Sequence, residues 1–137
     1  KNRLKEAIAH IPGVSFREQI DPHGDSATFL AFILDSNEHR QKVGRVLQEN
    51  GAGAICWAEN SWHFYPQWEH LLGASTQATS GWPFSEPGGR RRVVYDPEAL
   101  PASAELLDRT LVYPIAIRMS ETKLEDMEDA LKKAASC

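Results

Sequence analysis

The segment Trp57–His70 holds the residues of this chain whose types and spacing are best suited to chemistry. It contains three of the four tryptophans and two of the five histidines in the 137-residue sequence, so aromatic side chains are concentrated in one place. Asn, Glu, Ser and Tyr residues alternate with the rings. Flat apolar surface and directional hydrogen-bonding groups therefore occur together, as in the wall of a ligand site. The segment predicts a binding surface, and a packed core helix with a polar outer face is the alternative.

Charge and cysteine usage exclude several classes of partner. A formal net charge of −4 argues against a nucleic-acid partner, which requires a basic face. The run Arg90–Arg92 follows two glycines and predicts a solvated turn or a clamp for one anion. No apolar stretch is long enough to span a bilayer and no signal peptide is seen, so no membrane partner is expected. Cys56 and Cys137 have neither metal-ligand nor disulfide spacing, which favours a cytoplasmic protein.

Motifs for common catalytic and metal sites are absent from the sequence. No phosphate-binding glycine loop, HExxH or CxxC occurs. His63 and His70 are seven residues apart and suit one helical face, but a zinc site needs a third ligand, so no metal site is predicted. His10, His23 and His39 are interpreted as surface or loop residues.

The first half of the chain predicts two helices and two strands. Apolar residues at helical spacing predict a helix that ends near His10, before Pro12-Gly13. A short strand is expected from residue 14 to about 19, and a strand buried on both faces, or nearly so, at 28–34. Asp35 and Glu38 resemble a capping box that begins a helix, which Asn50-Gly51 ends.

The second half predicts a strand at 54–57 and a helix at 64–72, with Pro66 in its first turn. A long loop at 73–100 leads to a helix at 102–108. A strand follows at 111–117, where Pro114 indicates an edge position or a break. Thr122-x-x-Glu125 is expected to cap the last helix. This order predicts an α+β two-layer sandwich, with a small, mainly antiparallel sheet and helices packed on one side.

The order of these segments carries a resemblance to a known family. A helix leads to Ile11-Pro-Gly13, then come a strand, a helix to Asn50-Gly51, the aromatic segment, a Pro-rich loop, the stretch 102–114 and a last helix. This order resembles the C-terminal domain of the DegT/DnrJ/EryC1/StrS family of sugar aminotransferases, which are pyridoxal-phosphate (PLP) enzymes of fold type I. The resemblance covers essentially the whole chain and implies the small domain of that fold type.

The aromatic segment is similar to that of one branch of this family. The form Trp-x-x-Asn-x-Trp-His followed by Trp-x-His-Leu, from Trp57 to Leu71, is similar to the branch of 8-amino-octulosonate transaminases. Many members carry the His of a His-Tyr pair where this chain has Trp57. That departure favours an acidic, nucleotide-free sugar over a nucleotide sugar as the substrate.

The resemblance implies a role in recognition rather than in bond-making. The family's cofactor-bearing lysine and most PLP ligands belong to a large N-terminal domain, so this chain is expected to bind no PLP and to be inactive alone. Its six lysines are expected on solvated helix faces. The implied substrate-binding residues are Trp57 and Trp62 for sugar C–H faces, Asn60 and His63 for hydroxyls, and Arg109 or Arg90–Arg92 for a carboxylate.

Partners follow from the same resemblance. Residues 1–137 correspond to the small domain of a longer homodimeric enzyme, joined to the large domain and acting on a keto- or aldehydo-sugar. The chain opens at Lys1 as though in mid-helix, which indicates that the true start lies upstream. Two other hypotheses stay open: a non-enzymatic carbohydrate-binding module, and a ferredoxin-like regulatory domain that leaves the aromatic segment unexplained.

Overall fold

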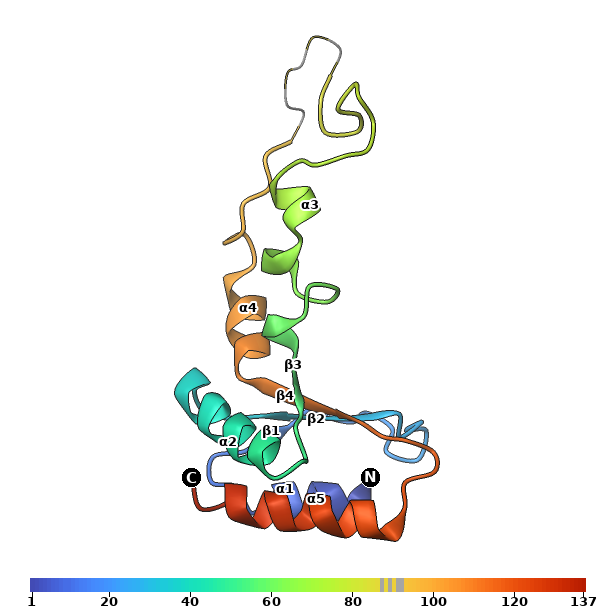
Figure 1. Cartoon of the computed structure of the whole chain (residues 1–137), viewed down its shortest axis with the longest axis vertical. Coiled ribbons are helices and arrows are strands. Elements are labelled where there is room, and N and C mark those ends of the chain that lie inside the picture. The colour runs from blue at the N-terminus through green and yellow to red at the C-terminus, as the bar shows by residue number, and fades with distance from the viewer. Residues whose placement is uncertain (87, 89, 91–92) are drawn as a thin grey trace. The chain divides into compact units, whose positions relative to one another are not determined.

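The computed structural model describes residues 1–86, 88, 90 and 93–137. The chain divides into two compact units: unit 1 is Lys1–Trp57 with Asp108–Cys137, and unit 2 is Ala58–Leu107. Within the described residues the chain forms five α-helices and one four-stranded antiparallel sheet, with helices packed against the sheet (Figure 1). It is therefore a small α+β protein.

The sheet lies in unit 1. Its strands are β1 (Ser15–Phe16), β2 (Phe29–Ile33), β3 (Ile55–Cys56) and β4 (Thr110–Pro114), in the order β1-β2-β4-β3. Neighbouring strands pair antiparallel, as the sequence predicts, and Leu111 of β4 lies opposite both Phe32 and Cys56. β4 is thus the strand that joins the other parts of the sheet.

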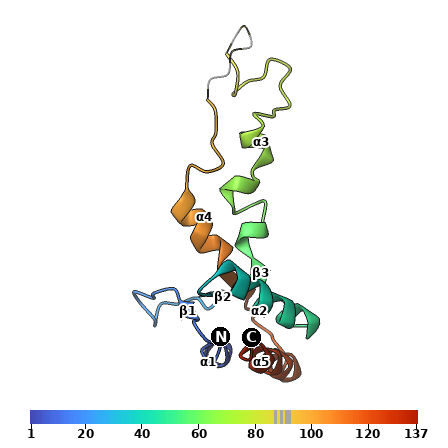
Figure 2. The same ribbon diagram turned by 90° about the vertical axis from the view of Figure 1, so that its left-hand side faces the viewer.

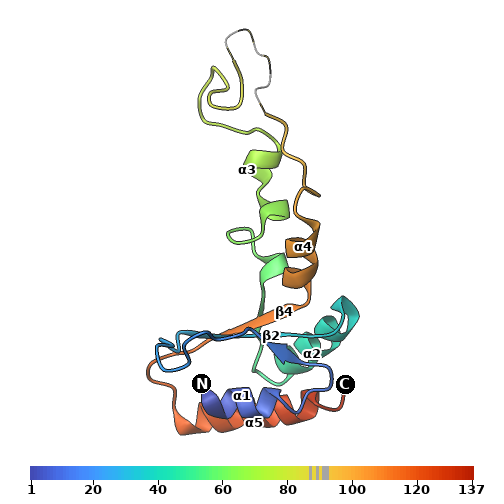
Figure 3. The ribbon, with the colours of Figure 1, turned by 180° about the vertical axis from the view of Figure 1, so that it is seen from behind.

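Three helices cover one face of the sheet. They are α1 (Asn2–Ile8), α2 (Asn37–Glu49) and α5 (Glu121–Ala134), and α5 packs against both α1 and α2. Figures 2 and 3 show α1 and α5 side by side on the same side of the sheet. Large apolar side chains fill the space between the layers, and each contributes about 1.5–3 kcal/mol by leaving water; they include Leu4, Ile8, Phe32, Leu47, Leu111 and Leu131.

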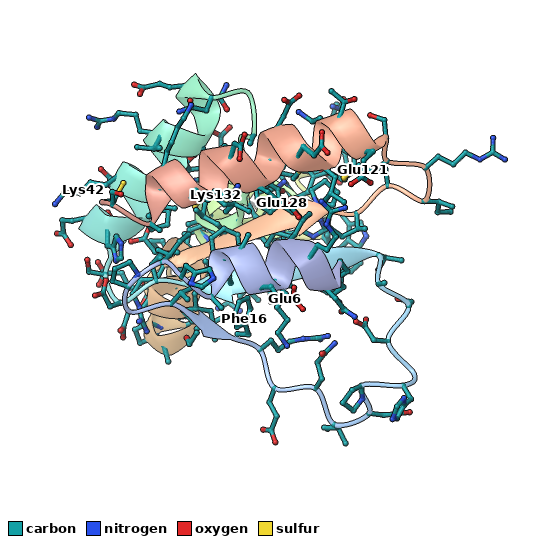
Figure 4. The ribbon with its side chains drawn as sticks, turned by 90° about the horizontal axis from the view of Figure 1, so that it is seen from below. Glu6, Phe16, Lys42, Glu121, Glu128 and Lys132 are labelled. Carbon is teal, nitrogen blue, oxygen red and sulfur yellow. The ribbon has the colours of Figure 1, made fainter. Side chains whose placement is uncertain are left out.

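Charged side chains tie α1 to α5 at the surface. Arg3 donates to the carboxylate of Glu128 through Nε and Nη2, each at 2.8 Å, and through Nη1 to Glu121 at 2.5 Å. Figure 4 shows Glu121 and Glu128 on α5 beside α1. Because these groups are partly exposed, the pairs fix the register of the two helices more than they add stability.

Two strand predictions need correction. β2 was expected to be buried on both faces, or nearly so, but only one face is fully buried: Leu30 and Phe32 are buried, whereas Phe29, Ala31 and Ile33 are half-buried. The second difference concerns β4, which ends at Pro114 rather than at residue 117. Pro114 therefore marks a break and not an edge strand, since β4 lies between β2 and β3.

Both predicted capping boxes are displaced. The N-cap of α2 is Ser36, whose hydroxyl accepts from the backbone N–H of His39 at 3.1 Å. The N-cap of α5 is Ser120, which accepts from Lys123 N–H at 3.2 Å. Each serine has extended backbone angles, as an N-cap requires, so Asp35 and Thr122 lie one residue before and two residues after the true caps. Gly51, with φ of +69°, ends α2 as predicted.

Unit 2 contains short helices. They are the 3₁₀ turns η1 (Trp57–Glu59, beginning in unit 1) and η2 (Tyr65–Gln67), then α3 (Glu69–Leu72) and α4 (Pro101–Asp108, ending in unit 1). The predicted helix at 102–108 is confirmed. The single helix predicted at 64–72 is wrong, because Trp68, with φ −83° and ψ 71°, leaves the helical conformation between η2 and α3. Among the described residues, no helix is both long and apolar enough to cross a bilayer.

Side chains of α2 hold the point where the chain returns to unit 1. The buried Arg40 donates through Nε to the backbone carbonyl of Asp108 at 3.0 Å, and its Nη2 lies 3.6 Å from the Asp108 carboxylate. The amide of Asn37 also donates to the Asp108 carboxylate and carbonyl. A cation at the last carbonyls of α4 is also favoured by the helix dipole.

We expect Arg40→Ala to lower the free energy of unfolding by about 2 kcal/mol, because it removes charge-assisted hydrogen bonds from a buried site. Urea denaturation followed by far-UV circular dichroism measures the change. Arg45→Ala is the matched control: Arg45 is exposed on the same helix, so its loss should stay within about 0.5 kcal/mol. Equal losses for the two variants would contradict the role given to Arg40.

Asp25 supplies a pH-dependent contact in the loop before β2. The Lys1 ammonium at 2.5 Å, the Ala27 N–H and the Gln19 amide hold the pKa of Asp25 at about 2, below its ordinary value of 3.8. Because the pKa is lowered by folding, the contribution to stability is complete above about pH 4 and disappears as the pH falls towards 2. Carboxyl-carbon NMR should show this low pKa, and Lys1→Gln should raise it. Lys5→Gln should leave it unchanged.

Candidate functional site

An open hollow in unit 2 is the strongest candidate for a binding site. It measures about 710 Å³ and lies on the aromatic segment that the sequence singles out. We call it the indole hollow and define it by its lining: Ser61, Trp62, Gln67, Trp68, Glu69 and His70. All six residues belong to unit 2, so the site does not depend on unit 1 for any lining side chain.

Local backbone contacts position this lining. The side-chain oxygen of Asn60 accepts from the N–H groups of Trp62 at 2.8 Å and His63 at 3.2 Å, which closes a tight turn. The Trp68 carbonyl accepts from Leu71 and Leu72 at the start of α3. Farther out, the Tyr65 hydroxyl donates to the Asp96 carbonyl at 2.8 Å and links the segment to the returning chain.

The rings of the hollow form a connected series. Trp68 and His70 stack, with centroids 6.4 Å apart and planes inclined by 26°, and Tyr65 meets Trp68 edge-on at 6.1 Å. Such contacts fix ring orientation. Trp62 extends from the neighbouring turn with 82% of its surface exposed. A tryptophan this exposed beside a stacked pair gives a flat, ligand-accessible surface.

Polar groups at the hollow are available for a ligand. In the part of the chain that the structure describes, the side chains of Ser61, Glu69 and His70 make no hydrogen bond or ion pair. The Gln67 amide donates to the Ala58 carbonyl at 3.4 Å, and its oxygen accepts no hydrogen bond from the described residues. The lining thus combines two indoles with a hydroxyl, an amide, a carboxylate and an imidazole, which suits a ligand with both apolar faces and hydroxyl groups.

The predicted site residues fall into two sets. Asn60, Trp62 and His63 are neighbours in unit 2, whereas Trp57 and Arg109 belong to unit 1. Asn60 acts by positioning, because its side-chain oxygen is engaged by the backbone of the turn. Trp62 lines the hollow, and His63 is exposed beside it. Of these three residues, only Trp62 is in the hollow itself.

Trp57 and Arg109 have structural surroundings in unit 1. The half-buried Trp57 packs beside Phe29 of β2, with ring centroids 6.3 Å apart. Arg109 donates through Nη1 to the Leu34 carbonyl at 3.1 Å and approaches the Asp35 carbonyl at 3.5 Å. These contacts join the end of β2 to the start of β4. The contacts of Arg109 account for its position without a substrate carboxylate.

The other basic residues predicted to bind a carboxylate are Arg90–Arg92. Arg90 is engaged through Nε and Nη2 by the Glu86 carboxylate, at 3.1 and 2.9 Å. Arg91 and Arg92 lie outside the described residues. The anion clamp predicted at Arg90–Arg92 therefore has no support from Arg90.

His39 differs from its prediction as a surface residue. Its side chain is only 13% exposed, and Nδ1 lies 2.7 Å from the Asp35 carboxylate. This hydrogen bond lowers the pKa of Asp35 below its ordinary value. Nε2 of His39 is buried and has no hydrogen-bond partner among the described residues. The pair lies at the first turn of α2, beside the N-cap Ser36.

The surroundings of the six lysines bear on where a PLP cofactor could be attached. A cofactor lysine must lie in an enclosed, desolvated setting. Here Lys1 pairs with Asp25, Lys132 pairs with Asp129, Lys123 donates to Gly51 and Lys133 to Asn50. Lys5 lies over the Phe16 ring and Lys42 is exposed. The prediction of solvated lysines is wrong for Lys1, whose side chain is only 12% exposed, but that lysine is engaged by Asp25.

Metal ligands and family comparison add no further site. Among the described residues, no three His, Cys, Asp or Glu side chains are grouped as metal ligands. No protein-family model matches the chain.

Five of the six lining residues of the hollow were not among the predicted substrate residues: Ser61, Gln67, Trp68, Glu69 and His70. The high aromatic density of Trp57–His70 was the signal that included them. A single helix at 64–72 would have separated Gln67 and Trp68 onto different faces. The break at Trp68 instead places η2 and the start of α3 on one hollow.

We expect Asn60→Ala to loosen the turn that presents Trp62, because the Trp62 N–H loses its acceptor and the His63 N–H keeps only its 3.3 Å bond to the Asn60 carbonyl. The cost is about 1 kcal/mol. Hydrogen exchange at the amides of Trp62 and His63 should become faster. Asn60→Asp keeps an acceptor oxygen at the same place and should preserve slow exchange. If Asn60→Asp and Asn60→Ala exchange equally fast, the side-chain oxygen does not hold the turn.

Proposed function

We propose that this chain is the substrate-recognition and site-closing domain of a cytoplasmic, PLP-dependent aminotransferase that transfers an amino group to a keto- or aldehydo-sugar. PLP would be held by a large N-terminal domain of the same polypeptide, and the enzyme would act as a homodimer. The chain itself would correspond to the small domain of PLP fold type I and would be inactive alone.

The burial of unit 2 carries this proposal. Among its described residues, Ala58 alone is buried, although the unit spans 50 residues, Ala58–Leu107. Large apolar side chains are instead exposed: Trp62, Trp82, Val93, Val94, Leu100 and Leu106. A segment of this size with no core of its own needs a surface to cover it, and exposed apolar groups in this number mark an interaction site. A large domain of the same enzyme is the occupant that we propose.

Two further features support the proposal. The observed order of elements, with the aromatic segment and a long connection between β3 and α4, agrees with the segment order on which the family resemblance rests. The lysines of this chain have other surroundings, which agrees with a cofactor held elsewhere. In such an enzyme, this chain would bind and orient the sugar and exclude water from it.

A carbohydrate-binding module without enzyme activity is the second candidate. The indole hollow favours it, because exposed indoles with amide, hydroxyl and carboxylate neighbours also suit a sugar ligand by themselves. The two candidates differ in whether the cofactor and a large domain are needed for function.

The location of the cofactor lysine tests the first candidate. The complete product of the gene should bind PLP, and borohydride reduction should fix the cofactor to one lysine. We expect peptide mapping to place this lysine outside residues 1–137. Fixation at Lys1, Lys5, Lys42, Lys123, Lys132 or Lys133, or no fixation at all, would contradict the proposal.

The 137-residue chain serves as the control in the same experiment. Incubated with PLP and reduced with borohydride, it should show only slow, unselective labelling spread over its lysines. A single rapidly labelled site in the chain alone would mean that the cofactor site is built here after all.

A further inference from the structure

We propose that the indole hollow binds the neutral or amino-bearing part of a saccharide and disfavours a carboxylate. This inference rests on the proposed function only in taking a sugar as the ligand. It names which residues contact the sugar and which sugars they select. A carboxylate on the same substrate would then have to be bound away from the hollow.

The rings of the hollow supply the apolar contact. Pyranose C–H faces are flat and apolar, and an indole offers a matching surface. Trp68 is held in orientation by His70 on one side and by the edge of Tyr65 on another. Trp62 is exposed next to it, on a turn that Asn60 closes. One indole is therefore fixed by its neighbours, and the other is presented by a hydrogen-bonded turn.

The polar rim supplies the directional contact. Ser61, Glu69 and His70 make no hydrogen bond within the described residues, so none would have to give up a protein partner to accept a hydroxyl group. A carboxylate takes two hydroxyl donors, and a hydroxyl and an imidazole each donate or accept. These groups lie on the same six-residue lining as the indoles. A polyhydroxylated ligand can satisfy them together.

Charge supplies the selectivity. Glu69 is the charged acid of the hollow, and neither lysine nor arginine lines it. The sequence of unit 2 contains no lysine; of its three arginines, Arg90 is engaged by Glu86, and Arg91 and Arg92 lie outside the described residues. A bound carboxylate would face Glu69 with neither lysine nor arginine in the lining, whereas a protonated amine would be attracted to Glu69. The hollow thus favours a sugar with an amino group over one with a carboxylate.

Three simple ligands test the inference on the full 137-residue chain: methyl glucoside, glucosamine and glucuronate, at one ionic strength. The four indole N–H signals are followed by NMR. We expect the signals of Trp62 and Trp68 to move with millimolar ligand while that of Trp82 stays in place. Glucosamine should bind at least threefold more tightly than glucuronate, and methyl glucoside should lie between them.

Variants assign the effect to the hollow. Trp68→Ala should abolish the shifts. Trp68→Phe keeps an aromatic ring and should retain weaker binding, so it tests the site even if the alanine variant does not fold. Glu69→Gln should remove the preference for glucosamine over methyl glucoside. Glu98→Gln removes the same charge elsewhere in unit 2, on an exposed side chain, and should leave the preference unchanged.

Other results would overturn the inference. Absence of indole shifts with all three ligands would mean that the hollow is not a saccharide site, and tightest binding of glucuronate would refute the charge selectivity. An equal effect of Glu98→Gln and Glu69→Gln would move the selectivity away from the hollow. The proposed function fails separately, when borohydride mapping of the complete gene product finds no PLP-bearing lysine outside this chain.

Discussion

The pairing of β4 with β3 and β2 is the constraint on which the rest of the structure depends. Leu111 lies opposite Cys56 on one side and Phe32 on the other, so β4 closes the sheet between strands far apart in the sequence. The rings of Tyr113 and Phe32 stack with centroids 5.8 Å apart, and the Tyr113 hydroxyl donates to the Ala52 carbonyl at 2.6 Å. Burial raises the pKa of Tyr113 above its ordinary value, which keeps the hydroxyl protonated and donating. A slip of one residue would turn this face of β4 away from the helices.

This pairing fixes where unit 2 leaves and re-enters the core. Unit 2 begins at Ala58, within η1 and two residues after β3, and ends at Leu107, three residues before β4, so both of its ends connect to neighbouring strands. Arg40 and Asn37 of α2 hold the returning end at Asp108. The two units therefore differ in composition: unit 1 contains the buried core, and unit 2 presents aromatic and polar side chains with almost no core of its own. Such a division suits recognition, because loops and short helices carry binding groups on a stable scaffold.

Much of the fold could be predicted from the sequence, since hydrophobic periodicity and glycine stops are local signals. The helices at α1, α2, α4 and α5 and the strands at β2 and β4 follow from apolar spacing, and Gly51 ends α2 as expected. Caps were misplaced because Ser36 and Asp35 are adjacent and both suit the role. Only the backbone geometry shows that the serine caps while Asp35 engages His39.

The sequence located the segment of the candidate site but did not predict the role of each residue in it. Aromatic density identified the segment, and Trp62 does line the hollow. Residue type could not show that Asn60 is engaged by its own turn or that Arg109 is engaged by the carbonyls of residues 34 and 35. It also could not show the break at Trp68, which brings Glu69 and His70 to the hollow. These outcomes depend on backbone angles and on contacts between distant residues.

Hydrogen exchange of residues 93–107 tests most directly whether unit 2 is covered by a larger domain. This stretch carries the exposed Val93, Val94, Leu100 and Leu106. Exchange would be measured by mass spectrometry in the 137-residue chain and in the complete gene product. We expect rapid exchange in the chain alone and at least tenfold slower exchange in the complete product. Equal exchange in the two proteins would contradict the view of unit 2 as a surface that a larger domain covers.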